Sequence, residues 1–279
     1  MRRHLGKVAV TVPRSDLVTR LRAAGSVFAE DEARLLTSAA RTPAALADMV
    51  DQRVAGVPLE HVLGRAEFCG LQIAVAPGVF VPRRRTELLV HEAAALAQPG
   101  AVIVDLCCGS GAVGAALAAT LDRVELHAVD IDHAAVLCAR RNLTRVDARV
   151  YEGDLYEPLP ASLRGRVDLL VANAPYVPTG EMGLMPPEAR LHEPLVALEG
   201  GPDGLDVLRR VAAAAPQWLA PGGHLLVETS RRQAPATLDL VACSGLVPRL
   251  VSSDELNATV VIGRRGNEAR AHRTGFQGS

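Results

Sequence analysis

The sequence predicts an α/β fold in which a small helical domain precedes an open, doubly wound, mostly parallel sheet. From residue 101 onward, short apolar runs typical of buried strands alternate with helical segments, an order typical of parallel sheets with right-handed crossovers. A glycine-containing turn connects the first of these runs to the next helix, as in nucleotide-binding sheets. Residues 15–64 differ, because their apolar residues recur at the three- and four-residue spacing of helices.

The chain divides into four expected segments. Residues 1–65 form the helical domain, with a loose basic arm at its start, and residues 66–82 form a β-hairpin that links this domain to the rest. Residues 83–264 form the sheet domain, and the polar tail, residues 265–279, is expected to be disordered. The helical domain has no side-chain cluster typical of catalysis, so we expect it to dock a partner or to cover the site.

Turn and cap residues predict where the individual helices and strands begin and end. Thr42 followed by Pro43 predicts the start of a helix that ends at Gly56, and Pro77-Gly78 predicts the hairpin turn. Other helices are expected near residues 17–24, 29–40, 58–63, 133–142 and 204–219, the last interrupted at Pro216. Strands are expected at residues 101–106, 125–129, 148–151, 167–172, 225–229, 248–252 and 258–263, the final two as a closing pair.

Composition argues against several classes of protein. The 30 basic residues nearly match the 31 acidic ones, so no overall field marks a nucleic-acid or membrane binder. No apolar run approaches the roughly 18 residues of a membrane-spanning helix, and the first residues lack the apolar core of a signal peptide. The five cysteines contain no C-x-x-C pair, so neither a disulfide framework nor a zinc site is expected. We expect a reduced, cytoplasmic protein without a metal.

The clearest candidate for catalysis follows the expected strand 167–172, where Asn173, Ala174, Pro175 and Tyr176 stand in a row. Ligands bind at the carboxyl ends of strands in open parallel sheets. The Asn173 side-chain oxygen and the Ala174 carbonyl oxygen can each accept one N–H of a planar NH2 group. Pro175 stiffens the turn, and Tyr176 offers a ring face for stacking. A strand that simply ends in a polar turn is the alternative interpretation.

A second group of residues forms a candidate cofactor site. It consists of Asp105, Cys107, Cys108, Gly109, Ser110, Gly111, Asp130, Asp154 and Leu155, together with Asn173. The glycines let the backbone approach a ligand closely, and Asp130, which ends the next strand, can accept hydrogen bonds from two ribose hydroxyls. The other two acids, Asp105 and Asp154, repel a pyrophosphate but suit the cationic amine and sulfonium of S-adenosylmethionine. We expect its amino group near Asp105 and its adenine amine near Asp154.

Two other interpretations of this loop stay open. Residues 109–114, GSGAVG, also fit the G-x-G-x-x-G string of dinucleotide-binding folds, so NAD is an alternative cofactor. The adjacent Cys107 and Cys108 could take part in metal or redox chemistry, although two neighbouring residues alone do not make a metal site. Small side chains that fill a tight turn explain this pair better.

In this order, the cofactor loop, the ribose-binding acid and the Asn-x-Pro-Tyr turn resemble the HemK/PrmC family of protein-(glutamine-N5) methyltransferases. These enzymes modify the glutamine of the Gly-Gly-Gln motif in peptide-chain release factors. The resemblance extends over nearly the whole chain, through residues 56–68, 81–87, 153–155, 193–205 and 227–233. It implies a Rossmann-like S-adenosylmethionine-dependent methyltransferase domain, with a release factor as protein substrate and a glutamine amide held at Asn173.

Several positions depart from the family pattern. Ala174 replaces a proline, so it keeps the carbonyl acceptor but loses the fixed φ angle. Cys107 replaces the first glycine of the loop, and Arg84 and Arg85 replace a proline and an acid. With Arg83 they form a basic run, which is either a solvated surface or a patch for an anionic ligand or RNA. These departures indicate a divergent member of the family.

Other acceptors and roles remain alternatives. The exocyclic amine of adenine in RNA or DNA suits the same turn if the base is flipped out, although the balanced charge disfavours nucleic acid. A small-molecule amide or guanidine is a third acceptor. A non-enzymatic module that binds S-adenosylmethionine is the last alternative, although a pure binder has no need of two acceptors beside the methyl group. The sequence does not indicate an oligomeric state.

Overall fold

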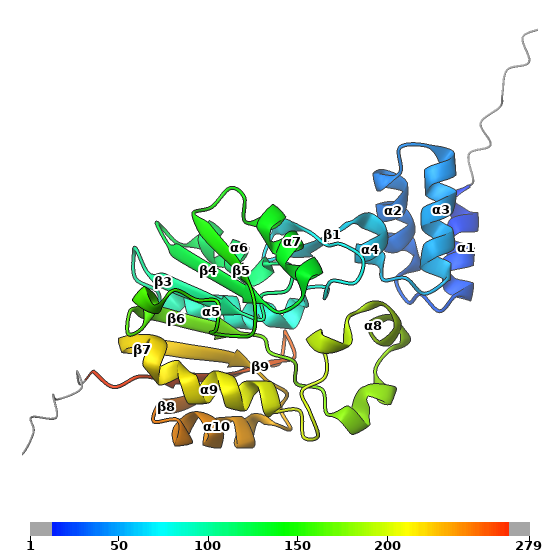
Figure 1. Ribbon diagram of the computed structural model, residues 1–279. Coiled ribbons are helices and arrows are strands. Elements are labelled where there is room, and N and C mark those ends of the chain that lie inside the picture. Colours follow the sequence, from blue (N-terminus) through cyan, green and yellow to red (C-terminus); the bar gives the residue numbers. More distant parts are fainter. Residues whose placement is uncertain (1–12, 268–279) are drawn as a thin grey trace, which may run out of the picture.

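The computed structural model describes residues 13–267 (Figure 1), so the expected basic arm and most of the expected disordered tail lie outside the described residues. The helices are α1 (Arg14–Ala23), α2 (Ala29–Ala39), α3 (Pro43–Val54), α4 (Leu59–Leu63), α5 (Glu87–Leu96), α6 (Ala112–Thr120), α7 (His133–Asn142), α8 (Pro187–His192), α9 (Asp206–Trp218) and α10 (Ala234–Cys243), with short 3-10 turns η1 (Arg84–Thr86), η2 (Ala161–Leu163), η3 (Thr179–Leu184) and η4 (Leu195–Ala197). The strands are β1 (Arg65–Phe68), β2 (Leu71–Ala74), β3 (Val102–Leu106), β4 (Glu125–Asp130), β5 (Ala148–Glu152), β6 (Val167–Ala172), β7 (Leu219–Glu228), β8 (Val247–Ser253) and β9 (Ala258–Arg264).

Helices α1 to α4 precede the first strand and share a small apolar core. Leu21 of α1, Leu36 of α2 and Val50 of α3 are fully buried in it. Thr42 caps α3 as predicted, since its hydroxyl oxygen accepts a hydrogen bond from the Ala45 amide at 3.1 Å. Figure 1 shows α1 to α3 to one side of the sheet, with α4 leading into β1. No helix within residues 13–267 has the length and apolarity that crossing a lipid bilayer requires.

The hairpin after α4 turns earlier than predicted. β1 and β2 pair in antiparallel fashion with Phe68 opposite Leu71, so the hairpin turn is at residues 69–70. Both turn residues have positive φ angles, 47° and 73°, which give the backbone twist that two-residue hairpins favour. The chain also turns at residues 77–78, where the Val79 amide donates to the Ala76 carbonyl oxygen at 3.1 Å, but this turn does not join the two paired strands. Val79, expected in the second strand, lies in a loop and is buried in a cluster that includes residues of α7.

Among the described residues, 13–267, the sheet has seven strands in the order β5-β4-β3-β6-β7-β9-β8. The strands from β5 to β7 in this order are parallel, and β8 and β9 close the sheet in antiparallel orientation, as predicted. β3 and β6 are neighbours although β4 and β5 separate them along the chain. Their carboxyl ends therefore flank the point where the strand order reverses, the usual ligand position in such sheets. The predicted α/β class is confirmed.

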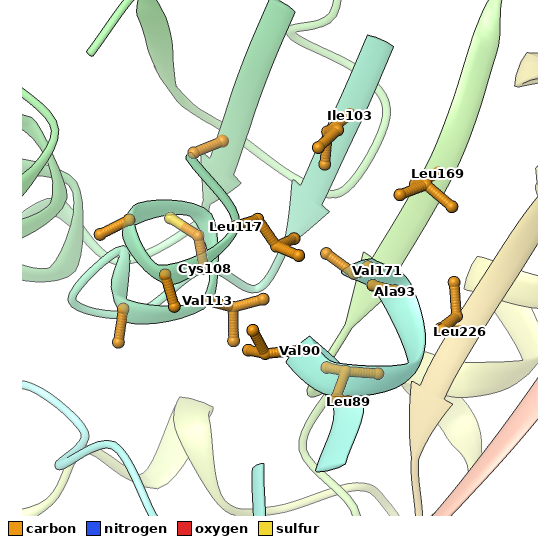
Figure 2. Packing of buried hydrophobic residues seen from close by; sticks show 14 of the residues in the cluster. Leu89, Val90, Ala93, Ile103, Cys108, Val113, Leu117, Leu169, Val171 and Leu226 are labelled. Atoms are coloured by element: carbon orange, nitrogen blue, oxygen red, sulfur yellow. The ribbon is translucent and has the colours of Figure 1, made fainter. Parts of the chain in front are cut away.

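Helices cover both faces of the sheet. Side chains of β3 alternate between two apolar cores: Ile103 packs with α5 and α6, whereas Val102 and Val104 pack with α9 and α10. Figure 2 shows the first core, where Leu89 of α5 and Leu117 of α6 lie around the strand residues. Because both cores consist of close-packed aliphatic side chains, the strand ends that carry the polar residues are held in fixed positions.

Two elements near the end of the chain differ from expectation. The strand expected at residues 225–229 extends over Leu219–Glu228, and a Cβ on Gly223 would lie only 2.7 Å from the Val167 carbonyl oxygen. Glycine there lets β7 approach β6 closely, so its first residues join the sheet. Pro216 does not interrupt α9 but stands inside it, in the last turn, where a missing N–H removes a single helical hydrogen bond.

Candidate functional site

A cavity of about 630 Å³ opens at the carboxyl ends of β3, β4 and β6. Its lining includes Asp105, Cys107, Cys108, Gly109, Ser110, Asp130, Asp154, Leu155, Asn173, Ala174, Pro175 and Tyr176. Gly111 is not part of the lining and packs against α7, where an added Cβ would come within 3.1 Å of Ala139. The fold thus brings nearly all the candidate residues, from four separate stretches of sequence, into one cavity.

The cofactor loop, residues 105–111, turns sharply between β3 and α6. Gly109 and Gly111 have φ angles of +54° and +76°, and Cys107 also has a positive φ, 55°. A residue with a Cβ pays about 1–2 kcal/mol for this left-handed conformation, so the departure from glycine at this position introduces backbone strain. Burial raises the pKa of the Cys107 thiol, which therefore stays protonated and is not activated as a nucleophile.

Two carboxylates adjoin this loop, the buried Asp105 and the half-buried Asp130. Asp105 is 2% exposed and accepts a hydrogen bond from the Gly114 amide at 3.1 Å. Burial, with the nearby charge of Asp130, raises the pKa of Asp105 to about 7. Asp130 accepts hydrogen bonds from the amides of Gly109, at 2.7 Å, and Asp132, at 2.9 Å, and burial raises its pKa as well. Negative charge is concentrated where a cationic ligand would be stabilised.

Asp154 differs from these two acids because it already has a cationic partner. Arg210 of α9 donates a hydrogen bond to its Oδ2 at 2.6 Å, and both side chains are partly exposed. Arg210 also lines the cavity, so a positive charge stands where the sequence predicts the adenine of the cofactor. Sequence reasoning missed Arg210, since it lies 56 residues after Asp154 on an amphipathic helix beside another exposed arginine, Arg209.

The acceptor turn, residues 173–176, presents two free acceptor atoms. Asn173 Nδ2 donates a hydrogen bond to Thr86 Oγ1 at 3.3 Å, so the amide oxygen points elsewhere. Within residues 13–267, no hydrogen bond engages Asn173 Oδ1 or the Ala174 carbonyl oxygen. Two successive oxygens are therefore available for the two N–H groups of a planar amine or amide.

Tyr176 is supported at both its backbone and its side chain. Its carbonyl oxygen accepts a hydrogen bond from Gln233 Nε2 at 2.9 Å, and Gly204 packs so closely that a Cβ there would overlap with this oxygen. The Tyr176 hydroxyl donates to Glu228 Oε1 at 3.3 Å. Burial, together with the charge of Glu228, raises the pKa of Tyr176 to about 12, so the phenol stays protonated.

The basic run at residues 83–85 is neutralised by acids from other parts of the chain. The pairs are Arg83–Glu193, at 2.6 Å, Arg84–Glu255, at 3.8 Å, and Arg85–Glu228, at 3.0 Å. The side chains of Glu193 and Glu228 are almost completely buried. The run is therefore not a free patch for RNA or an anionic ligand. Arg84 is the most exposed of the three, whereas Arg83 and Arg85 are partly exposed and line the cavity.

A long loop after the acceptor turn forms the outer wall of the cavity. This loop, residues 178–198, carries η3, α8 and η4. At its base, Val177 exchanges backbone hydrogen bonds of 2.9 Å with Leu198 and Gly200. Met185 and residues 194–198 line the cavity. The sequence reasoning did not identify this wall, because it contains no regular strand. Only the resemblance at residues 193–205 hinted at its importance.

Comparison with known proteins gives three findings. Residues 70–185 match the family model described as methyltransferase small domain. The chain is 40% identical over 224 residues to the release factor glutamine methyltransferase of Geobacter sulfurreducens, covering 80% of this chain and 78% of that protein. It is 39% identical to that of Mycolicibacterium smegmatis over 246 residues, 86% of each chain. A solved methyltransferase from Pyrococcus furiosus, 17% identical, aligns over 71% of this chain and 90% of its own with a TM-score of 0.53, which supports the fold alone.

Proposed function

The chain belongs to the family of release factor glutamine methyltransferases, and we propose that it methylates the side-chain nitrogen of a glutamine in a peptide-chain release factor, with S-adenosylmethionine as donor. One observation carries the proposal. The two free acceptors of the turn, Asn173 Oδ1 and the Ala174 carbonyl oxygen, share a cavity with the carboxylates at the ends of β3 and β4. One part of the cavity suits a primary amide, and the other suits a cationic cofactor.

The cofactor part fits S-adenosylmethionine by its charge. Within residues 13–267, no arginine or lysine forms an ion pair with Asp105, which is buried, or with Asp130, which is half-buried. An amino cation of the ligand beside Asp105 would compensate its buried charge. Asp130 would accept the ribose hydroxyls and Asp154 the adenine amine, with the backbone of residues 107–110 and Leu155 around them. The cofactor supplies an activated methyl group on a positively charged sulfur.

The acceptor turn positions the amide nitrogen of the substrate for methyl transfer. An amide nitrogen is a weak nucleophile because its lone pair is delocalised into the carbonyl group. Asn173 Oδ1 and the Ala174 carbonyl oxygen hold its two N–H groups and so direct the nitrogen toward the methyl group. Such positioning can lower a barrier by several kcal/mol, roughly 7–11 in ideal cases. Transfer from a sulfonium needs no strong base, and the proton released afterwards passes to water.

Thr86 supports this arrangement from outside the turn. The hydrogen bond from Asn173 Nδ2 to Thr86 Oγ1 spans 87 residues of sequence. It leaves the oxygen of Asn173, and not its nitrogen, as the atom available to the acceptor amide. Thr86 is 3% exposed, so water does not compete for the hydroxyl.

The surroundings of the cavity favour a protein substrate over a nucleic acid. The basic run is paired with acids, whereas the wall of the 178–198 loop exposes apolar side chains such as Leu195. Arg53 of α3 bonds to Glu188 of α8 at 2.7 Å, so the helical domain and this loop meet and can present one surface to a protein. We assign substrate docking to the helical domain, residues 1–65. We place the reaction in the cytoplasm, where release factors act.

The test is a transfer assay with labelled S-adenosylmethionine. Purified release factors, total RNA and total DNA are offered in parallel, and mass spectrometry locates the label. We expect the label on the glutamine of the Gly-Gly-Gln motif. Label in adenine would assign a nucleic-acid acceptor instead. Binding that NAD competes for, and S-adenosylhomocysteine does not, would overturn the cofactor assignment.

A further inference from the structure

A charge pair between the buried Glu228 and the partly exposed Arg85 stands beside the ring of Tyr176. Glu228, the last residue of β7, is 4% exposed. Its Oε1 accepts hydrogen bonds from Arg85 Nε, at 3.0 Å, and from the Tyr176 hydroxyl, at 3.3 Å. The guanidinium carbon of Arg85 lies 5.8 Å from the centre of the Tyr176 ring. Three separate segments, η1, the acceptor turn and the end of β7, therefore meet at one carboxylate oxygen.

Arg85 compensates the charge of Glu228. Among the described residues, the second oxygen of this carboxylate, Oε2, is buried and has no hydrogen-bond partner. A buried carboxylate that loses its cation becomes an uncompensated charge, which is strongly unfavourable. Arg85 also faces the Tyr176 ring at a distance where a cation is attracted to an aromatic face. Since the Tyr176 hydroxyl bonds to the same carboxylate oxygen, Arg85 holds the ring chiefly by compensating and fixing Glu228.

We propose that Arg85 is a positioning residue for the transfer step, and that it acts by holding the Tyr176 ring as a flat wall beside the acceptor amide. Both side chains line the cavity. The backbone of Tyr176 is held independently by Gln233 and by the close approach of Gly204. Loss of Arg85 therefore releases the ring without dismantling the turn. The identity of the acceptor rests on the proposed function, whereas the control of the ring does not.

The first arm of the test compares Arg85→Met with Arg84→Met. Methionine keeps an unbranched apolar stem but removes the charge and the donors. Arg84 is the matched control, since its side chain is 75% exposed and its acid partner lies 3.8 Å away at the surface. We expect Arg85→Met to lower kcat roughly 10- to 100-fold, with KM for the acceptor and Kd for S-adenosylmethionine within about twofold of the parent chain. Arg84→Met should leave all three values unchanged.

The second arm separates positioning from a general loss of folding. Glu228→Gln removes the buried charge but keeps an oxygen that can accept the Tyr176 hydroxyl. The double variant Arg85→Met/Glu228→Gln should therefore regain kcat to within about threefold of the parent chain, because no uncompensated charge remains. A double variant as slow as Arg85→Met, or an Arg85→Met chain that loses cofactor binding in parallel with activity, would overturn the proposal.

The third arm measures the NMR signal of the Tyr176 ring and needs no methyl acceptor. The chain has three tyrosines, so ring-labelled tyrosine gives a simple carbon NMR spectrum in which Tyr176→Phe identifies the Tyr176 signal. Arg85→Met should shift or broaden this signal and leave those of Tyr151 and Tyr156 in place. An unchanged Tyr176 signal refutes the positioning role. A parent chain that methylates no release factor refutes the proposed function instead, and the ring measurement still decides the role of Arg85.

Discussion

The two sides of the cavity are assembled in different ways. On the cofactor side, Asp105 lies in β3, Asp130 ends β4 and Asp154 follows β5. On the acceptor side, the turn at residues 173–176 is supported from far away in the sequence. Thr86, Glu228 and Gln233 lie 87, 52 and 57 residues from the turn residues they contact.

This difference has a consequence for function. Consecutive strands of a parallel sheet bring their carboxyl ends together whatever the side chains are, so the cofactor side follows from topology. The acceptor side depends on individual hydrogen bonds between distant segments. Substitutions on the cofactor side should therefore change ligand affinity, and those on the acceptor side should change the rate of transfer.

Asn173→Ala should show the largest difference between an effect on the rate of transfer and an effect on cofactor affinity. Removing one of the two acceptors that orient the amide should lower kcat by roughly 10²–10³-fold, the effect of losing a preorganised hydrogen-bonding group. Calorimetry should give a Kd for S-adenosylmethionine within about threefold of the parent chain. An equal loss of affinity and rate would place Asn173 on the cofactor side and contradict the comparison.

Gly204→Ala tests the backbone support of the acceptor side. Its φ angle is +78°, and an added Cβ would overlap with the Tyr176 carbonyl oxygen and Gln233 Nε2. We expect a loss of roughly 2–4 kcal/mol in the free energy of unfolding, from the left-handed backbone and the overlap together. Gly180→Ala is the control, because nothing lies within 4 Å of an added Cβ there. Equal melting temperatures for the two variants would show that the turn tolerates displacement.

Measuring the Kd for S-adenosylmethionine over a range of pH tests the role of Asp105 on the cofactor side. Asp105 has a pKa of about 7 in the ligand-free protein, and its protonated form cannot attract the amino cation of the ligand. Kd for S-adenosylmethionine should therefore rise about tenfold for each pH unit below 7 and level off above pH 8. Asp105→Asn should bind weakly at every pH, without this slope. A slope that persists in Asp105→Asn would assign the titration to another group.

The same pKa shift has the opposite sign for the stability of the ligand-free fold. Because the folded-state pKa of Asp105 is raised above the unfolded value of about 4, folding favours its protonated form. This contribution is fully present below pH 4 and is lost as the pH rises through 7. Thermal scans with and without S-adenosylmethionine should therefore diverge between pH 5 and 8, with the largest gain from the ligand at the higher pH.

The smallest effect is expected for Cys107→Gly. Glycine removes the strain of the positive φ at this position, about 1–2 kcal/mol, but adds about 0.5–1 kcal/mol of backbone entropy. We expect a net gain of roughly 0.5–1 kcal/mol, a rise of about 2 °C in Tm. Cys107→Ala keeps the strained backbone and should show no gain. A lower Tm for the glycine variant would mean that the thiol contributes packing that outweighs the strain.

The predictable parts of the molecule are those set by local pattern. The positions of Asp105 near the end of β3 and of Asp130 at the end of β4 follow from apolar runs that contain or precede these acids. The capping of α3 follows from Thr42 and Pro43. The placement of the acceptor turn beside the cofactor loop follows from the strand order. For these elements, the local sequence signals and the strand order agree, so their positions can be predicted from the sequence.

The parts that escaped prediction depend on contacts between distant segments or on unusual backbone angles. Arg85 and Glu228 are 143 residues apart, and no local pattern pairs them. The hairpin turn at residues 69–70 contains Cys69 with a positive φ, a conformation that few would assign to cysteine, whereas Pro77-Gly78 carries a stronger turn signal. The early start of β7 depends on the close approach of Gly223 to β6.

The 178–198 loop begins and ends side by side, where Val177 bonds to Leu198 and Gly200, and between these ends Glu188 and Glu193 tie it to Arg53 and Arg83. Doubling the length of a flexible surface loop costs only about 0.6 kcal/mol in closure entropy. A lineage that keeps the ion pairs of Glu188 and Glu193 can therefore lengthen or shorten the rest of this wall, while the turn that we propose to hold the reactive nitrogen stays as it is. The loop is the natural unit for grafting between relatives, and exchanging it is a direct way to redirect the enzyme toward a new protein.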